Sequence, residues 1–298
     1  MVRRIRVGDA TTYRIRWETV PIDKSIYETI RRESRKSRDF GPTTPEEWER
    51  RLARVNGKVR AGTRNINIAE LKSLYHILMQ NKIILRWKTM SPSKISQIAD
   101  RYATVGIMEL SREYDAPPVD LMMKILMSRA QYRAEVINEV FGDGIVSDQL
   151  NERDREQFKV ACEHDVNCAW LLRKVHSEAA RDESRVIAFF RDRCGIKMYD
   201  QNELAELQRE THGRAMCTPD IVFRDDVFIN DRRVRWLEFK GYIGTTAGHF
   251  FESNINQAMW YVNINGEGAL CYMFGHMSDV VIEGMQVLDA YALPNIAA

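Results

Sequence analysis

Apolar residues recur at helical spacing through the middle of the chain. A helix that begins near residue 66 would hold five of them on one stripe: Ile68, Leu71, Leu74, Ile77 and Leu78. Ser91 stands before Pro92, and proline is favoured at the first position of a helix, so another helix is predicted there. Thr44 likewise stands before Pro45, and Glu47 completes a capping box, which predicts a helix over residues 45–56.

Two short helices are predicted on either side of a break at residues 115–118. The first covers about residues 106–114, and the second runs to about residue 132. The second helix would bury its apolar side and present four side chains outward: Asp120, Lys124, Arg129 and Arg133. In helix-turn-helix proteins the second helix of such a pair reads DNA. An ordinary hairpin of a helical bundle is the alternative, and the carboxylate of Asp120 is unfavourable near phosphate.

The hydrophobic period changes in the back half. A helical region over about residues 153–193, interrupted near Asn167, is expected to end at Cys194 and Gly195. Apolar runs then predict strands over residues 196–199, 218–223, 234–239, 269–274 and 280–288, with helices after Asp200 and over residues 253–263. The links 225–226 and 230–231 should join the second and third of these strands. The back half is therefore predicted to be an α/β domain.

Length and composition limit the class of protein. The 298 residues are 44% hydrophobic and 29% charged, a globular composition with room for about two domains. The longest apolar run, residues 269–274, is far shorter than the roughly 20 residues of a membrane-spanning helix. No secretory signal is recognised at the start, and five cysteines make an odd number without paired spacing. We expect an intracellular protein of the nucleus or cytoplasm, with no membrane partner.

Charge is distributed unevenly along the chain. Residues 1–150 carry 27 Lys and Arg against 19 Asp and Glu, a balance of +8, whereas residues 151–298 carry 17 against 23, a balance of −6. Most basic residues of the first 60 are arginine, which suits phosphate, although a basic tail can also be merely solubilising. We expect a loosely packed basic arm with a short helix at residues 1–65, a helical nucleic-acid-binding domain at 66–150, and the α/β domain at 151–298.

Charged residues stand at the ends of two predicted strands. Asp220 begins one strand, and Glu238 and Lys240 end the next. If the two strands pair in antiparallel register, the start of one lies beside the end of the other, and the three side chains meet. Two carboxylates with a main-chain carbonyl suit Mg²⁺, and the lysine could orient a water molecule. A salt bridge at a strand edge is the alternative.

An acidic residue on an apolar helix face strengthens the metal hypothesis. Glu183 shares a face with the apolar residues 179, 186 and 190, in a helix that should pack on the sheet. Buried acids rarely lack a partner, so Glu183 is a candidate third carboxylate. A charge that reaches solvent is the alternative, and Asp182 or Glu178 would take its place if the helix were rotated.

A resemblance to a known family rests on these same residues. The spacing of 18 residues from Asp220, which follows Pro219, to the run 238–240 resembles the PD-(D/E)XK signature of restriction-endonuclease-like nucleases. The segment from Gln257 to Tyr261 is similar to the Gln-x-x-x-Tyr helix motif of many such nucleases. The full run 218–220, with Gly244, His249 and the strand ending at 272–275, narrows the resemblance to the TPD family. It covers about residues 100–290 and leaves out residues 1–65.

The resemblance implies a fold and an activity. The fold would be a restriction-endonuclease-like core, a mixed sheet flanked by helices, behind a helical, helix-turn-helix-like N-terminal domain. The activity would be cleavage of phosphodiester bonds in nucleic acid, DNA above all, with Mg²⁺ or Mn²⁺. Asp220, Glu238 and the backbone carbonyl of Phe239 would bind the metal, with Glu183 completing its surroundings. Lys240 would position the attacking water, while Gln257 and Tyr261 would brace the site or touch the nucleic-acid backbone.

Two other functions stay open. One is a catalytically inactive nuclease-fold adaptor, although loss of activity usually removes one of Asp220, Glu238 and Lys240. The other is a helix-turn-helix regulator whose back domain binds a small ligand. The family includes nucleases that interact with codanin, so the resemblance also raises a protein partner of the codanin type. The arginine-rich arm has no counterpart in the family. The family's partner interactions are therefore not carried over to this chain.

Overall fold

The computed structural model describes the chain except for residues 1, 8–9, 35–40, 60–65, 67, 144–147, 167–182, 248 and 291–298. The chain divides into two compact units. The first, here the sheet unit, consists of Met1–Lys24 together with Ser177–Ala298. The second, here the helical unit, consists of Ser25–His176.

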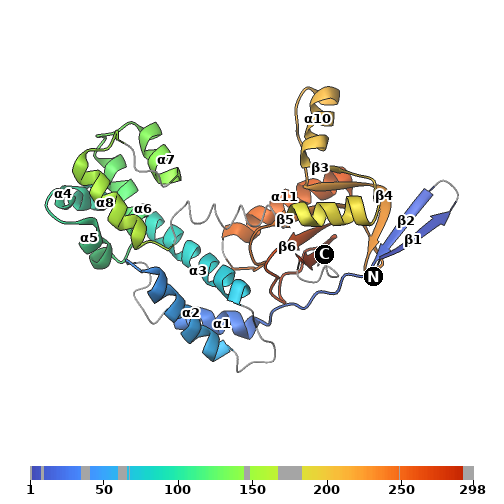
Figure 1. Ribbon diagram of the computed structural model, residues 1–298, viewed down its shortest axis with the longest axis horizontal. Coiled ribbons are helices and arrows are strands. Elements are labelled where there is room, and N and C mark those ends of the chain that lie inside the picture. Colours follow the sequence, from blue (N-terminus) through green and yellow to red (C-terminus); the bar gives the residue numbers. More distant parts are fainter. Residues whose placement is uncertain are drawn as a thin grey trace. The chain divides into compact units, whose positions relative to one another are not determined.

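The sheet unit is built on one mixed sheet. Its described strands are β1 (Val2–Val7), β2 (Ala10–Ile15), β3 (Met198–Asp200), β4 (Ile221–Ile229), β5 (Arg232–Lys240), β6 (Gly268–Tyr272) and β7 (Met285–Asp289). The order across the sheet is β1-β2-β4-β5-β6-β7, and β3 pairs with the first part of β4 (Figure 1). The pairs β1/β2, β3/β4 and β4/β5 are antiparallel, whereas β2/β4, β5/β6 and β6/β7 are parallel. The α/β prediction and its mixed sheet are confirmed.

The start of the chain belongs to this sheet. Tyr13, Ile15 and Trp17 are buried in its core, and the Trp17 indole N–H donates a 2.9 Å hydrogen bond to the carbonyl of Asp289. Further on, Ile22 forms a bridge with Met277. The expectation of a loosely packed arm is therefore wrong for residues 10–22. Tyr13 and Ile15 lie within the expected arm, but they form one buried face of β2.

The β4–β5 hairpin also differs from the expected link. β4 continues through Asp225 and Asp226 to Ile229, with a register shift between Val222 and Val227. The turn is the two-residue pair Asn230 and Asp231, which have φ angles of 49° and 63°. Asparagine and aspartate tolerate this left-handed conformation, and two-residue hairpin turns require it.

Helices pack against the sheet and frame its central strands. α10 (Gln201–His212) starts with the predicted capping box of Asp200 and Glu203, and α11 (His249–Asn265) packs on β5 and β6. Residues 183–188 are helical and continue as a π-helical turn, η1 (Phe189–Arg193). Phe190 of that turn joins Trp17 and Phe223 in the core. The predicted helix end holds, because Gly195 has a φ of 68°.

The helical unit consists of eight described helices. They are α1 (Lys24–Ser34, whose first residue lies in the sheet unit), α2 (Pro45–Val59), α3 (Ile68–Thr89), α4 (Pro92–Tyr102), α5 (Ile107–Tyr114), α6 (Pro118–Ser128), α7 (Ala134–Asp143) and α8 (Glu152–Glu163). The Thr44 capping box is present, with Thr44 and Glu47 exchanging hydrogen bonds of 3.0 and 3.2 Å. Ser91 caps α4 as expected. None of the described helices is long and apolar enough to cross a membrane.

One buried carboxylate ties several of these helices together. Asp154 of α8 is 1% exposed and accepts hydrogen bonds from the hydroxyls of Tyr102 and Tyr132, at 2.9 and 2.6 Å. The side-chain amide of Asn151 donates a third bond at 2.8 Å. Both oxygens of Asp154 are therefore hydrogen-bonded, and this carboxylate links α4, α8 and the loop before α7.

The predicted recognition helix is shorter than expected. α6 ends at Ser128 rather than near residue 132, because the chain leaves the helix at Arg129 and Ala130 takes a φ of 51°. The inward side is as predicted, with Leu121, Ile125 and Leu126 buried. Arg133 instead stands directly before α7.

Candidate metal centre

The antiparallel register of β4 and β5 brings the predicted carboxylates together. Ile221 pairs with Leu237, so Asp220 lies beside Glu238. Asp220 reaches across to β5, where its Oδ2 accepts a 2.7 Å hydrogen bond from the backbone N–H of Phe239. The side chains of Asp220, Glu238 and Lys240 are all nearly buried, with 8%, 6% and 9% of their surface exposed. Charged groups this deep need partners within the protein.

Lys240 stands at the centre of a hydrogen-bonded chain. Its Nζ donates to Oε1 of Glu238 at 2.8 Å and to Oε1 of Gln257 at 2.7 Å. The amide nitrogen of Gln257 in turn donates to the hydroxyl of Tyr261 at 2.8 Å, and the Tyr261 ring packs edge-on against Trp236. Gln257 and Tyr261 lie one turn apart on α11, and this spacing lets both side chains serve one site. In this structure both residues belong to the hydrogen-bonded chain at Lys240, and the two roles expected for them stay predictions.

Glu183, in the helical segment 183–188, interacts electrostatically with the carboxylates of the site. Burial raises its pKa, and the charge of Glu238 raises it further. Burial also raises the pKa of Asp220, to about 8, with contributions from the charges of Glu238 and Glu183. The three carboxylates therefore crowd one another, and like charges in a buried place favour a proton or a cation. The alternatives Glu178 and Asp182 lie outside the described residues.

The unused oxygen atoms of the site are those that a divalent cation would need. Oε2 of Glu238 is buried and has no hydrogen-bond partner among the described residues. The Phe239 N–H faces Asp220, and in a strand the carbonyl of the same residue points the same way. No group of three or more His, Cys, Asp or Glu side chains within the described ranges is arranged to hold a metal ion. Asp220, Glu238 and the Phe239 carbonyl offer oxygen donors, with Glu183 nearby, and the chemistry of this set fits a hard ion that keeps several waters.

The back half of the chain matches a known protein family. Residues 150–291 match the family described as "Protein of unknown function TPD sequence-motif". This segment is similar to that family and is here called the TPD-motif domain. Its motif Thr218-Pro219-Asp220 contributes the first carboxylate of the site. Comparison with curated proteins and comparison with solved structures gave no match.

One positioning residue of the TPD-motif domain escaped the sequence prediction. Gln208 of α10 holds the chain just before the motif: its Oε1 accepts from the backbone N–H groups of Met216 and Cys217 at 2.7 and 3.0 Å. Its amide nitrogen donates to the carbonyl of Cys217 at 2.5 Å. All three hydrogen bonds go to main-chain atoms, so no pattern of side chains in the sequence indicates that Gln208 contacts this segment. Gln208 thereby holds in place the chain segment that leads to Asp220.

Two other residues of the motif pattern lie around the site. Gly244 follows the strand that carries Lys240, and a Cβ atom there would lie 2.7 Å from the Tyr272 ring and 2.8 Å from His276. Only glycine fits so close an approach. His249 begins α11, but its side chain lies outside the described residues.

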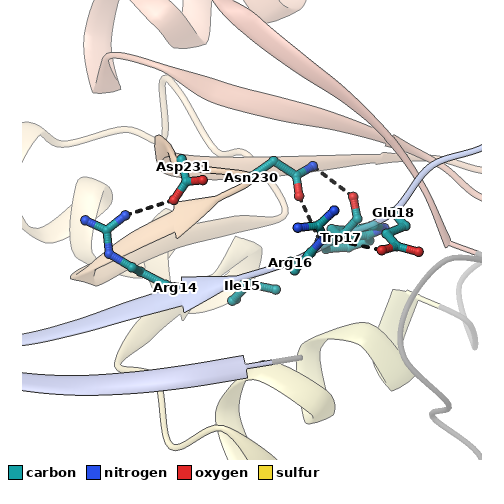
Figure 2. A pocket seen from close by; sticks show the side chains of 7 residues that line it. All are labelled: Arg14, Ile15, Arg16, Trp17, Glu18, Asn230 and Asp231. Carbon is teal, nitrogen blue, oxygen red and sulfur yellow. Dashed lines mark hydrogen bonds and ion pairs between the residues drawn. The ribbon is translucent and has the colours of Figure 1, made fainter.

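A hollow elsewhere in the sheet unit holds none of these residues. It has a volume of about 560 Å³ and lies beside the end of β2 and the β4–β5 turn (Figure 2). Arg14 forms a 3.0 Å ion pair with Asp231 on its rim, and Asn230 exchanges hydrogen bonds with the backbone of Trp17. These polar groups already bond one another, and their bonds attach the end of β2 to the β4–β5 turn.

The predicted nucleic-acid contacts do not share one helix. Lys124 lies on α6 with its Nζ 4.8 Å from the centre of the Trp87 ring. Arg129 follows the end of that helix, 5.9 Å from the Tyr102 ring, and Arg133 precedes α7. Asp120, also predicted to face outward, receives a 3.4 Å hydrogen bond from Trp87, and burial raises its pKa. The start of α6 is thus partly packed against α3.

Proposed function

We propose that the TPD-motif domain is a metal-dependent nuclease that hydrolyses phosphodiester bonds in nucleic acid, with DNA as the expected substrate. The observation that carries this proposal is the meeting of Asp220, Glu238 and Lys240, with one carboxylate oxygen of Glu238 left without a partner. An ordinary salt bridge would engage one carboxylate with one lysine. Here a second carboxylate and Glu183, a third, raise the energy of the ionised site because like charges repel one another. This repulsion does not stabilise the fold.

Asp220, Glu238 and the carbonyl of Phe239 would hold Mg²⁺ or Mn²⁺ in this proposal. Oxygen donors and a high local negative charge are what such ions favour. When bound, the ion would polarise a phosphate oxygen and stabilise developing charge. Glu183 would complete the surroundings of the ion, since its charge interacts with those of Glu238 and Asp220.

Lys240 has the geometry to hold a water molecule or a phosphate oxygen. An ammonium group carries three hydrogens, and two of them are used on Glu238 and Gln257. The third hydrogen is available to a reactant. Gln257 and Tyr261 fix the amine from the side of α11, so the reactant would meet a rigid donor.

The helical unit would supply contacts to the nucleic-acid backbone in this proposal. Lys124, Arg129 and Arg133 remain the proposed contacts, supported by the excess of basic residues in the first half of the chain. An intracellular site of action, in the nucleus or cytoplasm, and a protein partner of the codanin type are likewise proposals.

Incubation with labelled nucleic acids tests the function. The full chain would be mixed with single-stranded, duplex and four-way-junction DNA and with RNA, each with Mg²⁺, Mn²⁺ or EDTA. We expect cleavage of at least one substrate with a metal and none with EDTA, and Asp220→Asn should remove it. Binding without cleavage in every mixture would contradict the proposal and favour the adaptor or the regulator. Cleavage that survives Asp220→Asn would place the activity elsewhere.

A further inference from the structure

Large apolar side chains are exposed on the segments that carry residues of the candidate metal centre. Trp260 is 54% exposed on α11, and Met259 and Ile264 of the same helix are 40% and 51% exposed. Met216, which is 51% exposed, lies in the segment that leads into the TPD motif. These four residues are here called the Trp260 patch. They come from the two segments that also deliver Asp220, Gln257 and Tyr261 to the site.

Helix spacing and hydrogen bonds place Trp260 close to Gln257 and to the segment that leads into the TPD motif. Trp260 is three residues from Gln257, so the two side chains are neighbours on the helix surface, and Gln257 touches Lys240. Asn265 donates a 3.4 Å hydrogen bond to the Cys217 sulfur. Burial raises the pKa of that thiol, a hydrogen bond from Trp260 acts against the rise, and the charge of Glu238 adds to it. The indole N–H is therefore turned toward the protein, and the ring is left open to solvent.

We propose that Trp260 stacks on an unpaired nucleobase next to the phosphate held at Lys240, so that the site takes single-stranded or locally unpaired nucleic acid. This inference rests on the proposed nuclease function and adds the class of substrate to it. Base faces stack well on tryptophan whatever their sequence, but in a duplex they are covered by neighbouring bases. A duplex therefore reaches the site only where its strands are open.

The surroundings of the patch favour a base over a protein partner. A stable protein interface buries about 800 Å² on each side, with some 20 residues or more, whereas the patch has four apolar side chains. The exposed neighbours Asn256 and Asn263 on the same helix are amides, which can hydrogen-bond the edges of bases. Stacking beside hydrogen-bonding groups is how unpaired bases are commonly bound.

Binding measured without cleavage tests the stacking. The full chain carrying Asp220→Asn would be titrated into fluorescent oligothymidylate, oligouridylate, an abasic strand of equal length and a duplex, with anisotropy as the readout. Adding Trp260→Ala should weaken binding of both single strands roughly 5- to 100-fold. It should leave the duplex and the abasic strand within about twofold, because neither presents a free base face. Loss for only one of the two single strands would identify DNA or RNA as the preferred source of the base.

Two further variants separate stacking from a general loss of structure. Trp260→Phe keeps an aromatic face and should retain most of the single-strand affinity, while Val281→Ala changes an exposed apolar residue outside the patch and should have little effect. Equal weakening of the duplex and abasic strand, or no weakening of the single strands, would overturn the inference. An unchanged single-strand affinity would assign the patch to another contact, such as a protein. If the wild type cleaves nothing but Trp260→Ala still weakens single-strand binding, the nuclease function fails and the stacking stands.

Discussion

Asp154 in the helical unit and Glu238 in the sheet unit are both almost removed from solvent, at 1% and 6% exposed. Three hydrogen bonds from Tyr102, Tyr132 and Asn151 satisfy both oxygens of Asp154. Glu238 receives one hydrogen bond, from Lys240, and lies among other carboxylates with its second oxygen unpartnered. A buried acid whose oxygens are satisfied stabilises a fold, whereas one left crowded and incomplete is held at a cost that function explains.

The first and largest test of this comparison removes the crowded carboxylates. Asp220→Ala or Glu238→Ala should lower metal-dependent cleavage by about 1,000-fold or more, because the metal and the phosphate lose their main charge partner. Asp154→Ala should leave the cleavage rate of the folded protein unchanged. Initial rates on a labelled substrate, with circular dichroism to check folding, give the answer. A crowded-site variant that cuts at the wild-type rate would remove that residue from the site.

Asp154 should instead dominate stability. Asp154→Ala should lower the free energy of unfolding by about 3 kcal/mol, because it leaves two buried hydroxyls and an amide without their acceptor. Asp220→Asn should cause no such loss, since it relieves repulsion in its neighbourhood. Thermal melting of each full-length variant in EDTA measures both. Similar melting temperatures for the two variants would erase the distinction between the two kinds of acid.

Lys240 sharpens the comparison by separating charge from metal binding. Lys240→Ala should slow cleavage about 100-fold while metal affinity changes little, because the amine acts on the water or the phosphate. Calorimetric titration with Mn²⁺, alongside rate measurements, separates the two effects. Collapse of metal affinity together with the rate would show that Lys240 mainly positions Glu238 through their hydrogen bond.

Gln208 tests whether the position of Asp220 matters as much as its charge. Gln208→Ala removes three hydrogen bonds to the chain before the motif and should reduce cleavage about tenfold through misplacement of the carboxylate. The metal concentration for half-maximal rate should rise. Glu210→Ala on the same helix, whose side chain is exposed, is the matched control. If the two variants behaved alike, α10 would be a structural helix with no influence on the site.

A last expected effect is a dependence of stability on pH without metal. The pKa of Asp220 is raised in the folded state, so its stabilising contribution is complete below about pH 4 and is lost as the pH rises toward 8. Wild type should therefore lose stability relative to Asp220→Asn as the pH rises between these limits. Urea unfolding of both proteins at several pH values in EDTA measures the difference. If the free energy of unfolding changed with pH in the same way for both proteins, the carboxylates would not repel one another appreciably.

Local signals explain which parts of this structure could be predicted. The caps at Thr44 and Asp200, and the antiparallel pair that joins Asp220 to Glu238, depend on residues close in sequence. The placement of Tyr13 beside Val227 depends on a pairing across more than 200 residues, for which a single sequence carries no local mark. Gln208 was missed for another reason, because its partners are main-chain atoms that every residue possesses. The activity itself stays a prediction.

The pairing of β2 with β4 also bears on how the chain is made and divided. The sheet unit takes its first two strands from the start of the chain and its other described strands from beyond residue 197, with the helical unit synthesised between them. During translation β2 must wait for β4 to emerge, so the helical unit can fold first. A fragment limited to residues 150–291 would leave the residues of β4 that pair with Thr12 to Ile15 as an open edge, with Trp17 missing from the core. Such an edge invites aggregation, and expression of the isolated domain should include residues 10–22, fused or supplied as a peptide.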